Sequence, residues 1–490
     1  MSRGPGRAVD VVDGGLVKPL LVLSFPIILT NMMQVGYNLA DTFWVGRLGQ
    51  EAVSALSFSW ALVFLVISLA AGFSVAGTVL VAQNKGAENP DRVNHVAGQT
   101  IGFVVLLSAV FSVVGYLLAP WMLSLIGAAP GSAEYRLALE YTRTMFLGVP
   151  FVFSFFIFQS LLQGWGDTRT PMYLMGFGVL LNVVVDPFFI LGFRNNVLFA
   201  WLGLQGVEAQ LYALTRFAGF GVQGAAIATI ASRGIGAVIA IGLLLSGYVG
   251  IQPAPSDFRL TASTIKKIVA VGAPASVEQS SRALGVTVIT ALVAMAGADA
   301  VAAYGIGNRL LSLVFLPAIG LARGTETVVG QNLGAEQVDR ARHAVFASGA
   351  ILAGALALVS LGAFVYAEPI VGVFIAGEGA ESVVAIGAEY LHIIGPTFAF
   401  LGIFRVVQGG FRGSGSTRLA MVFSILSLFA IRVPLAYALT ALLGLGATGV
   451  WYAIAFSNVA ILALAGGWFL RGTWTEAVID AESRRPAAGD

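Results

Sequence analysis

Twelve long apolar stretches run through this chain, and they limit its possible folds more than any other feature. They cover residues 19–45, 53–83, 93–118, 135–163, 171–192, 221–247, 264–295, 301–330, 341–366, 384–411, 418–443 and 447–470. Each exceeds the ~18 residues at which an apolar run is long enough for a transmembrane helix. With 57% apolar and 11% charged residues, the chain is also far more apolar than a soluble domain. The sequence therefore predicts an all-α polytopic membrane protein with twelve transmembrane helices.

One polar loop occurs twice. The segment VAQNKGAENPDRVNH (Val81–His95) and the segment VGQNLGAEQVDRARH (Val329–His343) are identical at nine of fifteen positions. The same ungapped shift of 248 residues aligns Pro26 with Pro274. Because six predicted helices make up each copy, both copies enter the membrane from the same side. This indicates a parallel repeat of two six-helix bundles, related by an axis along the membrane normal.

The duplication predicts the domain organisation. The expected parts are an N-terminal segment (1–18), an N-lobe with helices 1–6 (19–248), a linker (249–263), a C-lobe with helices 7–12 (264–471) and a tail (472–490). Of the twenty Lys and Arg residues assigned to the loops, span ends and termini, sixteen lie on the side of the two chain ends. Basic loops favour the cytoplasm, so we expect both termini there, in the plasma membrane. We expect the short polar end of the tail to be disordered.

The repeated loop is expected to have an architectural role. Gly86 and Gly334 stand where a helix C-terminus favours a left-handed residue. Asp91 and Asp339 are expected to cap the following helices. Retention in both halves fits a shared fold better than one asymmetric functional site.

Polar residues in the first predicted helix share one face. Gln34, Tyr37, Asn38 and Asp41 stand at i, i+3, i+4 and i+7. An Asp near the centre of a membrane helix costs ~2.5–3.5 kcal/mol on insertion scales, so Asp41 is a functional candidate. The residue aligned with it in the second half is Ile289.

Other helices of the first half carry matching polar positions. Asn182 and Asp186 share a face of the fifth helix at i, i+4, and the sixth helix contributes Thr229. Their counterparts in the second half are apolar: Ile431, Leu435 and Ile454. At 1.5 Å per residue, four polar side chains lie ~9–12 Å below the outer ends of their helices. These four are Asp41, Tyr141, Asp186 and Thr229. We therefore expect one polar chamber in the N-lobe only, although two separate hydrogen-bonded structural acids are the alternative.

These motifs resemble the multidrug and toxic compound extrusion (MATE) transporters, in particular the prokaryotic DNA-damage-inducible branch. The similarity covers the chain from Pro26 to about Leu470 and includes Pro in helix 1, QxxYNxxD after it and NxxxD in helix 5. It implies a V-shaped pair of lobes, alternating access, and export of organic cations or amphipaths coupled to inward H⁺ or Na⁺. It also implies that Tyr141 and Thr229 belong to the site. The connection 193–221 between helices 5 and 6 is longer than the family leads us to expect.

The residues support such coupling by two alternative routes. Two carboxylates in one desolvated chamber cannot both be comfortably ionised, so one should take up a proton readily. Pro26 removes a helix hydrogen bond to the Val22 carbonyl and is expected to act as a hinge. Alternatively, the oxygens of Asp41, Asn182, Asp186 and Thr229 make a hard-ligand set suited to Na⁺. Gln34, Tyr37, Asn38 and Tyr141 are expected to line the substrate cavity. The sequence does not decide between the ions.

Other charges in the spans receive simpler interpretations. Glu278 and Arg282, at i, i+4, are expected to pair, and His392 is expected to be structural. Arg309, Arg323, Glu326, Arg405 and Arg432 are assigned to no site.

Three function classes remain open at this stage. An ion-coupled exporter is favoured by the acidic chamber. A flippase for lipid-linked sugars would be marked by a strongly basic cavity, whereas the helix faces appear neutral or acidic. A passive channel needs no buried acid pair. We expect no enzymatic activity, no cofactor besides the coupling ion, no nucleic-acid partner, contact with membrane lipids, and a monomer. No catalytic motif and no Cys are present.

Overall fold

The protein is helical throughout the part of the chain that the computed structural model describes, residues 8–377, 379–476 and 478. The polar end of the tail lies outside these residues. The elements of the first half are α1 (Val17–Gly46), α2 (Gln50–Gly86), α3 (Pro90–Leu125), α4 (Ala133–Trp165), α5 (Arg169–Leu191), α6 (Val197–Trp201), α7 (Gln205–Thr215) and α8 (Val222–Leu245). A 3₁₀ turn, η1 (Pro255–Phe258), lies in the linker.

The second half has the same order of long helices with more interruptions. Its elements are α9 (Ala262–Ala294), α10 (Ala298–Gly334), α11 (Val338–Val365), α12 (Ala367–Gly372), α13 (Ala380–Ile394), η2 (Gly395–Thr397), α14 (Phe398–Gly413), α15 (Thr417–Ile425), η3 (Leu426–Arg432), α16 (Val433–Tyr437), η4 (Ala438–Leu442) and α17 (Gly446–Leu470). The segments η3 and η4 are π-helical. The runs α13–α14 and α15–η4 each form one long membrane-crossing unit.

Eleven helical units of the described chain are long and apolar enough to cross a membrane. The remaining predicted span is α9, which is 33 residues long but is less apolar. Glu278 and Arg282 lie near its middle, in the polar run SVEQSSR, and lower its mean hydropathy. Large apolar side chains face outward elsewhere, such as Leu117 of α3, which is 66% exposed. An apolar exterior is what lipid requires, so the prediction of a polytopic all-α membrane protein is confirmed.

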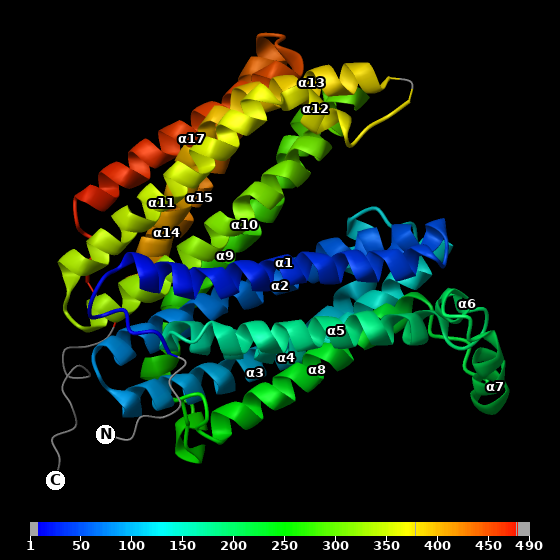
Figure 1. Ribbon diagram of the computed structural model, residues 1–490, viewed down its shortest axis with the longest axis horizontal. Helices are drawn as coiled ribbons and strands as arrows, with labels where there is room; N and C mark the ends of the chain where they lie inside the picture. Colours follow the sequence, from blue (N-terminus) through cyan, green and yellow to red (C-terminus); the bar gives the residue numbers. More distant parts are fainter. Residues whose placement is uncertain (1–7, 378, 477, 479–490) are drawn as a thin grey trace.

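The helices form two groups arranged as a V (Figure 1). We call α1–α8 the N-lobe and α9–α17 the C-lobe. The lobes meet near the end where α1 begins and α17 ends, and they diverge toward the other end. Across the junction, α2 packs on α9 and α10, and α1 packs on α10. Each lobe has its own apolar core.

The repeated loops explain how the lobes meet. A Cβ atom added to Gly86 would lie 2.6 Å from the carbonyl carbon of Gln331, and one added to Gly334 would lie 2.7 Å from that of Gln83. The two glutamines make a second matched pair of contacts. Gln83 Nε2 donates to the Gly413 carbonyl at 3.1 Å, and Gln331 Nε2 donates to the Gly164 carbonyl at 2.8 Å. The two copies of the loop segment therefore contact each other reciprocally across the pseudo-two-fold axis.

These contacts correct the expected capping roles. Gly86 and Gly334 do not adopt left-handed backbone angles; Glu88 and Glu336 do, with φ of 54° and 61°. The glycines are required by close approach of another backbone, not by turn geometry. Asn89, not Asp91, caps α3 by accepting a hydrogen bond from the Arg92 amide.

Asp339 does not cap α11 either. The N-cap of that helix is Gln337, whose side chain makes no capping hydrogen bond. Both aspartates lie in the first helical turn, where a negative charge complements the helix dipole.

The segment before α1, residues 9–14, bridges the two lobes at the same end. The Val9 amide donates to the Gly166 carbonyl of the N-lobe at 3.0 Å. Arg340 of the C-lobe donates to the carbonyls of Val11, Asp13 and Gly14 at 2.8–3.2 Å. Val11 itself is fully buried. The end of the molecule where α1 begins and α17 ends is thus closed by these two helix ends and by residues 9–14.

The long connection between α5 and α8 folds into the short helices α6 and α7, which lie at the far end of the N-lobe (Figure 1). Trp201 packs against Phe43 and Trp44 of α1, with ring centroids 6.1 and 5.9 Å apart. The extra residues therefore cover the end of α1, while α8 still places Thr229 beside α1, as described below.

Candidate functional site

A polar cluster in the N-lobe brings together α1, α5 and α8. Tyr37 of α1 donates its hydroxyl to Thr229 Oγ1 of α8 at 2.6 Å. Within α5, Asn182 Nδ2 donates to Asp186 Oδ1 at 2.8 Å, as the i, i+4 spacing requires. Asp41 lies close enough to Asp186, Asn182 and Thr229 to interact with them electrostatically. The three helices thus converge on a pair of carboxyl groups, Asp41 and Asp186.

The carboxyl pair is buried and short of hydrogen-bond donors. Asp186 and Asn182 are fully buried, and Asp41 is 8% exposed. Among the described residues, no donor reaches Asp41 Oδ1, Asp186 Oδ2 or Asn182 Oδ1. Two adjacent carboxylates repel each other strongly in a low-dielectric interior. The arrangement therefore needs a proton or a small cation to satisfy its oxygens.

Arg233 of α8 belongs to this cluster, and sequence reasoning missed it. Its guanidinium hydrogen-bonds to Gln34 Oε1 and lies 5.2 Å from the centre of the Tyr37 ring. It is also within electrostatic range of Asp41. A positive charge in the apolar run ATIASRGIGA follows the rule that drew attention to Asp41, so the signal was present in the sequence.

A cavity adjoins the carboxyl pair. It has a volume of about 310 Å³ and is lined by α1, α2 and α4, including Asn38, Asp41, Trp60 and Tyr141. Asn38 accepts a hydrogen bond from Gln34 Nε2 at 3.0 Å. The structure therefore places all the predicted cavity residues around one region: Gln34, Tyr37, Asn38 and Tyr141. Asp41 belongs to both the cavity wall and the carboxyl pair.

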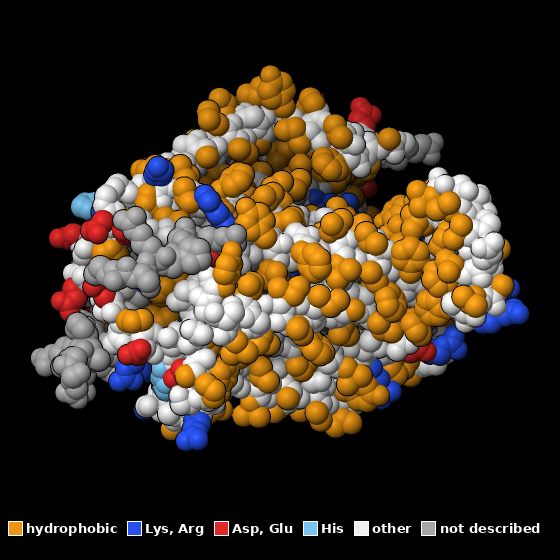
Figure 2. Space-filling view, turned by 60° about the horizontal axis from the view of Figure 1, so that its bottom comes forward, with side chains coloured by type: hydrophobic (Ala, Val, Ile, Leu, Met, Phe, Trp, Pro, Cys, Tyr) orange, Lys and Arg blue, Asp and Glu red, His pale blue; other side chains and the backbone are white. Residues whose placement is uncertain are grey.

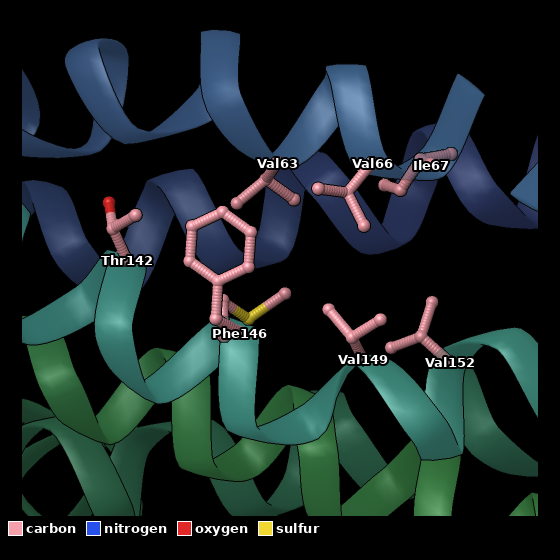
Figure 3. Close-up of a pocket in the computed structure, with 8 residues that line it drawn as sticks. Val63, Val66, Ile67, Thr142, Phe146, Val149 and Val152 are labelled. Atoms are coloured by element: carbon pink, nitrogen blue, oxygen red, sulfur yellow. The ribbon is translucent and has the colours of Figure 1, made fainter. Parts of the chain in front are cut away.

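A second opening in the N-lobe is of a different kind (Figure 3). It lies between α2 and α4, has a volume of only about 20 Å³, and is lined mainly by valines, Met145 and Phe146. Thr142 contributes the one hydroxyl, whose oxygen has no hydrogen-bond partner in the described structure. Such a space has room for about one water molecule and only one hydroxyl to orient a ligand. We do not assign it to the site.

Pro26 lies in the uninterrupted helix α1 and is buried, and its neighbours Ser24 and Ile28 face α10. A Cβ atom at Gly320 of α10 would lie 3.2 Å from the Ile28 amide. Thr30 Oγ1 donates to the Pro26 carbonyl at 2.8 Å. The hinge role of Pro26 remains a prediction.

The donor set suits a hard cation or a proton. Two carboxylates, the Asn182 amide oxygen and the Thr229 hydroxyl offer only oxygen ligands, as Na⁺ prefers. The three oxygens without donors are consistent with this use. Among the described residues, no group of three His, Cys, Asp or Glu side chains could hold a metal ion.

Arginines, not acids, line the cavity of the C-lobe. Its cavity has a volume of about 370 Å³, and its lining includes Ile289 and Ile454 together with Arg282, Arg405 and Arg432. The interpretation of the helix faces as neutral or acidic is therefore wrong for this lobe. The arginines come from three separate elements, α9, α14 and η3, and no single segment shows them together.

Some of the other C-lobe charges form the ion pairs that the sequence predicts. Glu278 and Arg282 form the predicted ion pair at 2.5 Å, and Arg412 joins it at 2.5 Å. Arg323 lies 3.9 Å from Glu326. His392 Nε2 lies 3.0 Å from the Phe364 carbonyl oxygen, which is a structural contact.

Comparison with known proteins supports both the repeat and the fold. The sequence model of the MatE family matches residues 26–188 and 274–438, so the two matches begin at the aligned prolines Pro26 and Pro274. "Probable multidrug resistance protein YoeA" of Bacillus subtilis is 28% identical over 455 residues, covering 90% of this chain and 91% of its own. "Probable multidrug resistance protein NorM" of Thermotoga maritima is 27% identical over 476 residues, covering 95% of both chains.

Solved structures agree with the V-shaped arrangement. A MOP superfamily transporter from Pyrococcus furiosus superposes with a TM-score of 0.84 at 23% identity, covering 97% of this chain and 99% of the other. A structure described as MATE in the bent conformation gives 0.83 at 23% identity, covering 95% and 97%. At these identities the likeness shows the fold.

Proposed function

The chain belongs to the MATE family of transporters, and from this membership we propose that it is a secondary active exporter of organic cations or other amphipaths in exchange for inward H⁺ or Na⁺. Family membership assigns transport and not catalysis. Relatives that cover almost the whole chain are named as multidrug resistance proteins, which supports drug efflux. The motifs QxxYNxxD and NxxxD favour the DNA-damage-inducible branch of the family.

The observation that carries the coupling proposal is the carboxyl pair in one lobe only. Asp41 and Asp186 are buried together, and Ile289 and Leu435 stand at the matching C-lobe positions. Because the pair needs a proton or cation, binding of either one neutralises charge beside the cavity. Loss of that charge weakens the hold on a cationic substrate in the same cavity. Ion and substrate therefore compete, which is the requirement for exchange.

The proposed ion ligands are Asp41, Asn182, Asp186 and Thr229. H⁺ binds to a carboxyl oxygen, whereas Na⁺ needs several oxygens at once. Arg233 lies within electrostatic range of Asp41 and opposes the binding of any cation there. We therefore expect the positive charge of the bound ion and that of the Arg233 guanidinium to compete for Asp41.

The proposed driving force is sufficient. Each charge that moves across 100 mV supplies about 2.3 kcal/mol, or roughly a 50-fold concentration ratio.

We propose that both termini lie in the cytoplasm of a plasma-membrane protein and that the chain works as a monomer. In that orientation the closed end of the V is cytoplasmic and the lobes diverge toward the outside (Figure 1).

Transport by purified protein in proteoliposomes tests the proposal. Export of a fluorescent organic cation is measured with an imposed pH gradient and, separately, an imposed Na⁺ gradient. Asp41→Asn and Asp186→Asn are expected to abolish gradient-driven export while membrane abundance stays normal. Glu140→Gln is the matched control, because Glu140 is an exposed acid of the same lobe. Near-normal export by both Asp variants would refute an N-lobe coupling site.

A second candidate function gains support from the C-lobe. Flipping of lipid-linked sugars requires a basic cavity for the pyrophosphate, and Arg282, Arg405 and Arg432 line the C-lobe cavity. The acidic N-lobe pair favours the exporter. Gradient-dependent movement of a lipid-linked sugar, without export of the cation, would favour the flippase.

A further inference from the structure

The C-lobe cavity has a strongly one-sided charge. Its lining includes three arginines and no Asp or Glu. Basic side chains are visible inside the hollow between the lobes in the space-filling view (Figure 2). Charged groups in a membrane interior are costly and need partners or water, so their pairing decides what the cavity can bind.

The nearby carboxylates are already engaged. Glu278 is fully buried, accepts hydrogen bonds from Arg412 at 2.5 and 3.1 Å, and also pairs with Arg282 at 2.5 Å. One carboxylate thus serves two guanidinium groups. Glu326 is also buried and lies near Arg323. Within the described chain, neither acid forms an ion pair with the other two arginines of the cavity.

Arg405 and Arg432 therefore lack an acidic partner. Arg432 is held in place by neutral groups: its Nε donates to Ser457 Oγ at 2.7 Å and its Nη2 donates to Asn458 Oδ1 at 2.8 Å. Arg405 makes no hydrogen bond or ion pair within the described chain. It lies within electrostatic range of two cations, Arg412 and Arg432, and of one anion, Glu278. The cavity lining therefore has an excess of positive charge.

An aromatic wall accompanies these charges. Tyr304 and Tyr390 line the cavity, and both rings pack on Trp451, with centroids 5.9 and 4.9 Å away. A Cβ atom at Gly307 would lie 2.6 Å from the Tyr390 ring, so the absence of a side chain there leaves room for that ring. Tyrosines held in this way provide rigid apolar faces. Flat apolar groups and oxyanions are thus both accommodated.

We propose that this cavity is an oxyanion subsite, in which Arg405 and Arg432 bind the carboxylate, sulfonate or phosphate of an aromatic amphipath. A guanidinium presents a planar fork of donors that matches such groups. The inference rests on the proposed export function insofar as the ligand is a substrate. It adds anionic aromatic amphipaths to the substrate class.

Binding without any gradient tests this subsite separately from transport. Three probes share one bicyclic ring: 1-naphthalenesulfonate, neutral 1-naphthalenemethanol and cationic 1-naphthylmethylammonium. Their affinities are measured by fluorescence on protein in phosphatidylcholine nanodiscs, with empty nanodiscs subtracted. We expect Arg405→Met to weaken sulfonate binding by about 10- to 100-fold, the range for a hydrogen bond to a charged group. The cationic probe should bind the variant no more weakly.

Two further variants separate this role from a structural one. Arg405→Lys keeps the charge and should recover part of the sulfonate affinity. Arg309→Met removes a charge from an exposed residue of the same lobe that does not line the cavity, and it should leave sulfonate binding unchanged. Equal sulfonate affinity in wild type and Arg405→Met would overturn the proposal, as would an equal loss in Arg309→Met. Failure of gradient-driven export with intact sulfonate binding would count against the proposed function alone.

The oxyanion has two possible sources, an exported solute or a lipid headgroup. Nanodiscs that contain phosphatidylglycerol distinguish them. If phosphatidylglycerol weakens sulfonate binding to the wild type, and Arg405→Met abolishes this weakening, the subsite is assigned to a lipid phosphate. Unchanged binding assigns it to a solute anion. Either result supports the oxyanion chemistry, whereas weakening of equal size in wild type and Arg405→Met contradicts it.

Discussion

Alanine at either of the two junction glycines should open the closed end of the V. Gly86 of α2 approaches Gln331 of α10, and Gly334 of α10 approaches Gln83 of α2. An added Cβ would lie 2.6 or 2.7 Å from a backbone carbon of the other lobe, well inside the 3.4 Å at which ordinary contact begins. The atoms it meets are backbone atoms, so a side-chain rotation cannot relieve the overlap.

Separation of the lobes relieves the overlap most easily, because the clash lies between two bundles and not within one. Inserting one methyl group into a packed contact costs about 1–3 kcal/mol. The closed arrangement should therefore lose roughly 5- to 150-fold in population relative to an opened one. The pseudo-symmetry predicts the same effect for Gly86→Ala and Gly334→Ala.

Distances between spin labels measure this opening. The chain has no Cys, so cysteines at the exposed positions Asp91 and Asp339 label only the first turns of α3 and α11. Both alanine variants should show a new population at longer distance. Gly362→Ala is the control, since no atom lies within 4 Å of its added Cβ. Unchanged distances in both variants, or an equal change in the control, would refute the reasoning.

Three further predictions concern stability. Glu278→Gln removes the carboxylate that pairs with Arg282 and Arg412, and breaking such a buried pair should cost about 3–5 kcal/mol, visible as a lower Tm. Thr142→Val replaces a buried hydroxyl that has no partner in the described structure, so Tm should stay constant or rise; a clear fall would contradict this account. Arg340→Ala removes the hydrogen bonds to residues 9–14, so proteolysis of that segment should accelerate while the helices remain protected; equal protection of the segment would show that these bonds are dispensable.

The helices were predictable because hydropathy is a property of consecutive residues. The expected span 53–83 became Gln50–Gly86, and the expected span 447–470 became Gly446–Leu470. The expected span 264–295 became Ala262–Ala294, but this helix, α9, is less apolar than the others because of Glu278 and its neighbours.

The convergence of the N-lobe residues was also predictable, because helical spacing and depth place side chains on one face at one level. Asn182 and Asp186 illustrate this, since the i, i+4 spacing alone brings them into contact. Arg233 was not predicted, although a charge within an apolar run is the signal that identified Asp41; its contacts with Gln34 and Tyr37, on a different helix, are known only from the structure.

The contacts at the lobe junction and in the C-lobe cavity could not be predicted. Gly86 resembled a helix cap, and only the tertiary structure shows the backbone of Gln331 against it. The C-lobe cavity likewise depends on how α9, α14 and η3 pack, so Arg405 and Arg432 carried no joint signal in the sequence. A single residue in a predicted span indicates whether its side chain is buried. The residue that it contacts is known only from the fold.

The reciprocal contact at Gln83 and Gln331 has a consequence for the origin of the molecule. Each half supplies both the glutamine and the carbonyl that the other half's glutamine binds, so the junction is isologous, like the interface of a two-fold homodimer. A chain of only six helices could have formed the same junction with a second copy of itself. Fusion through the linker would then have freed the two copies to diverge, one toward buried acids and the other toward arginines, while the self-complementary surface that joins them stayed the same.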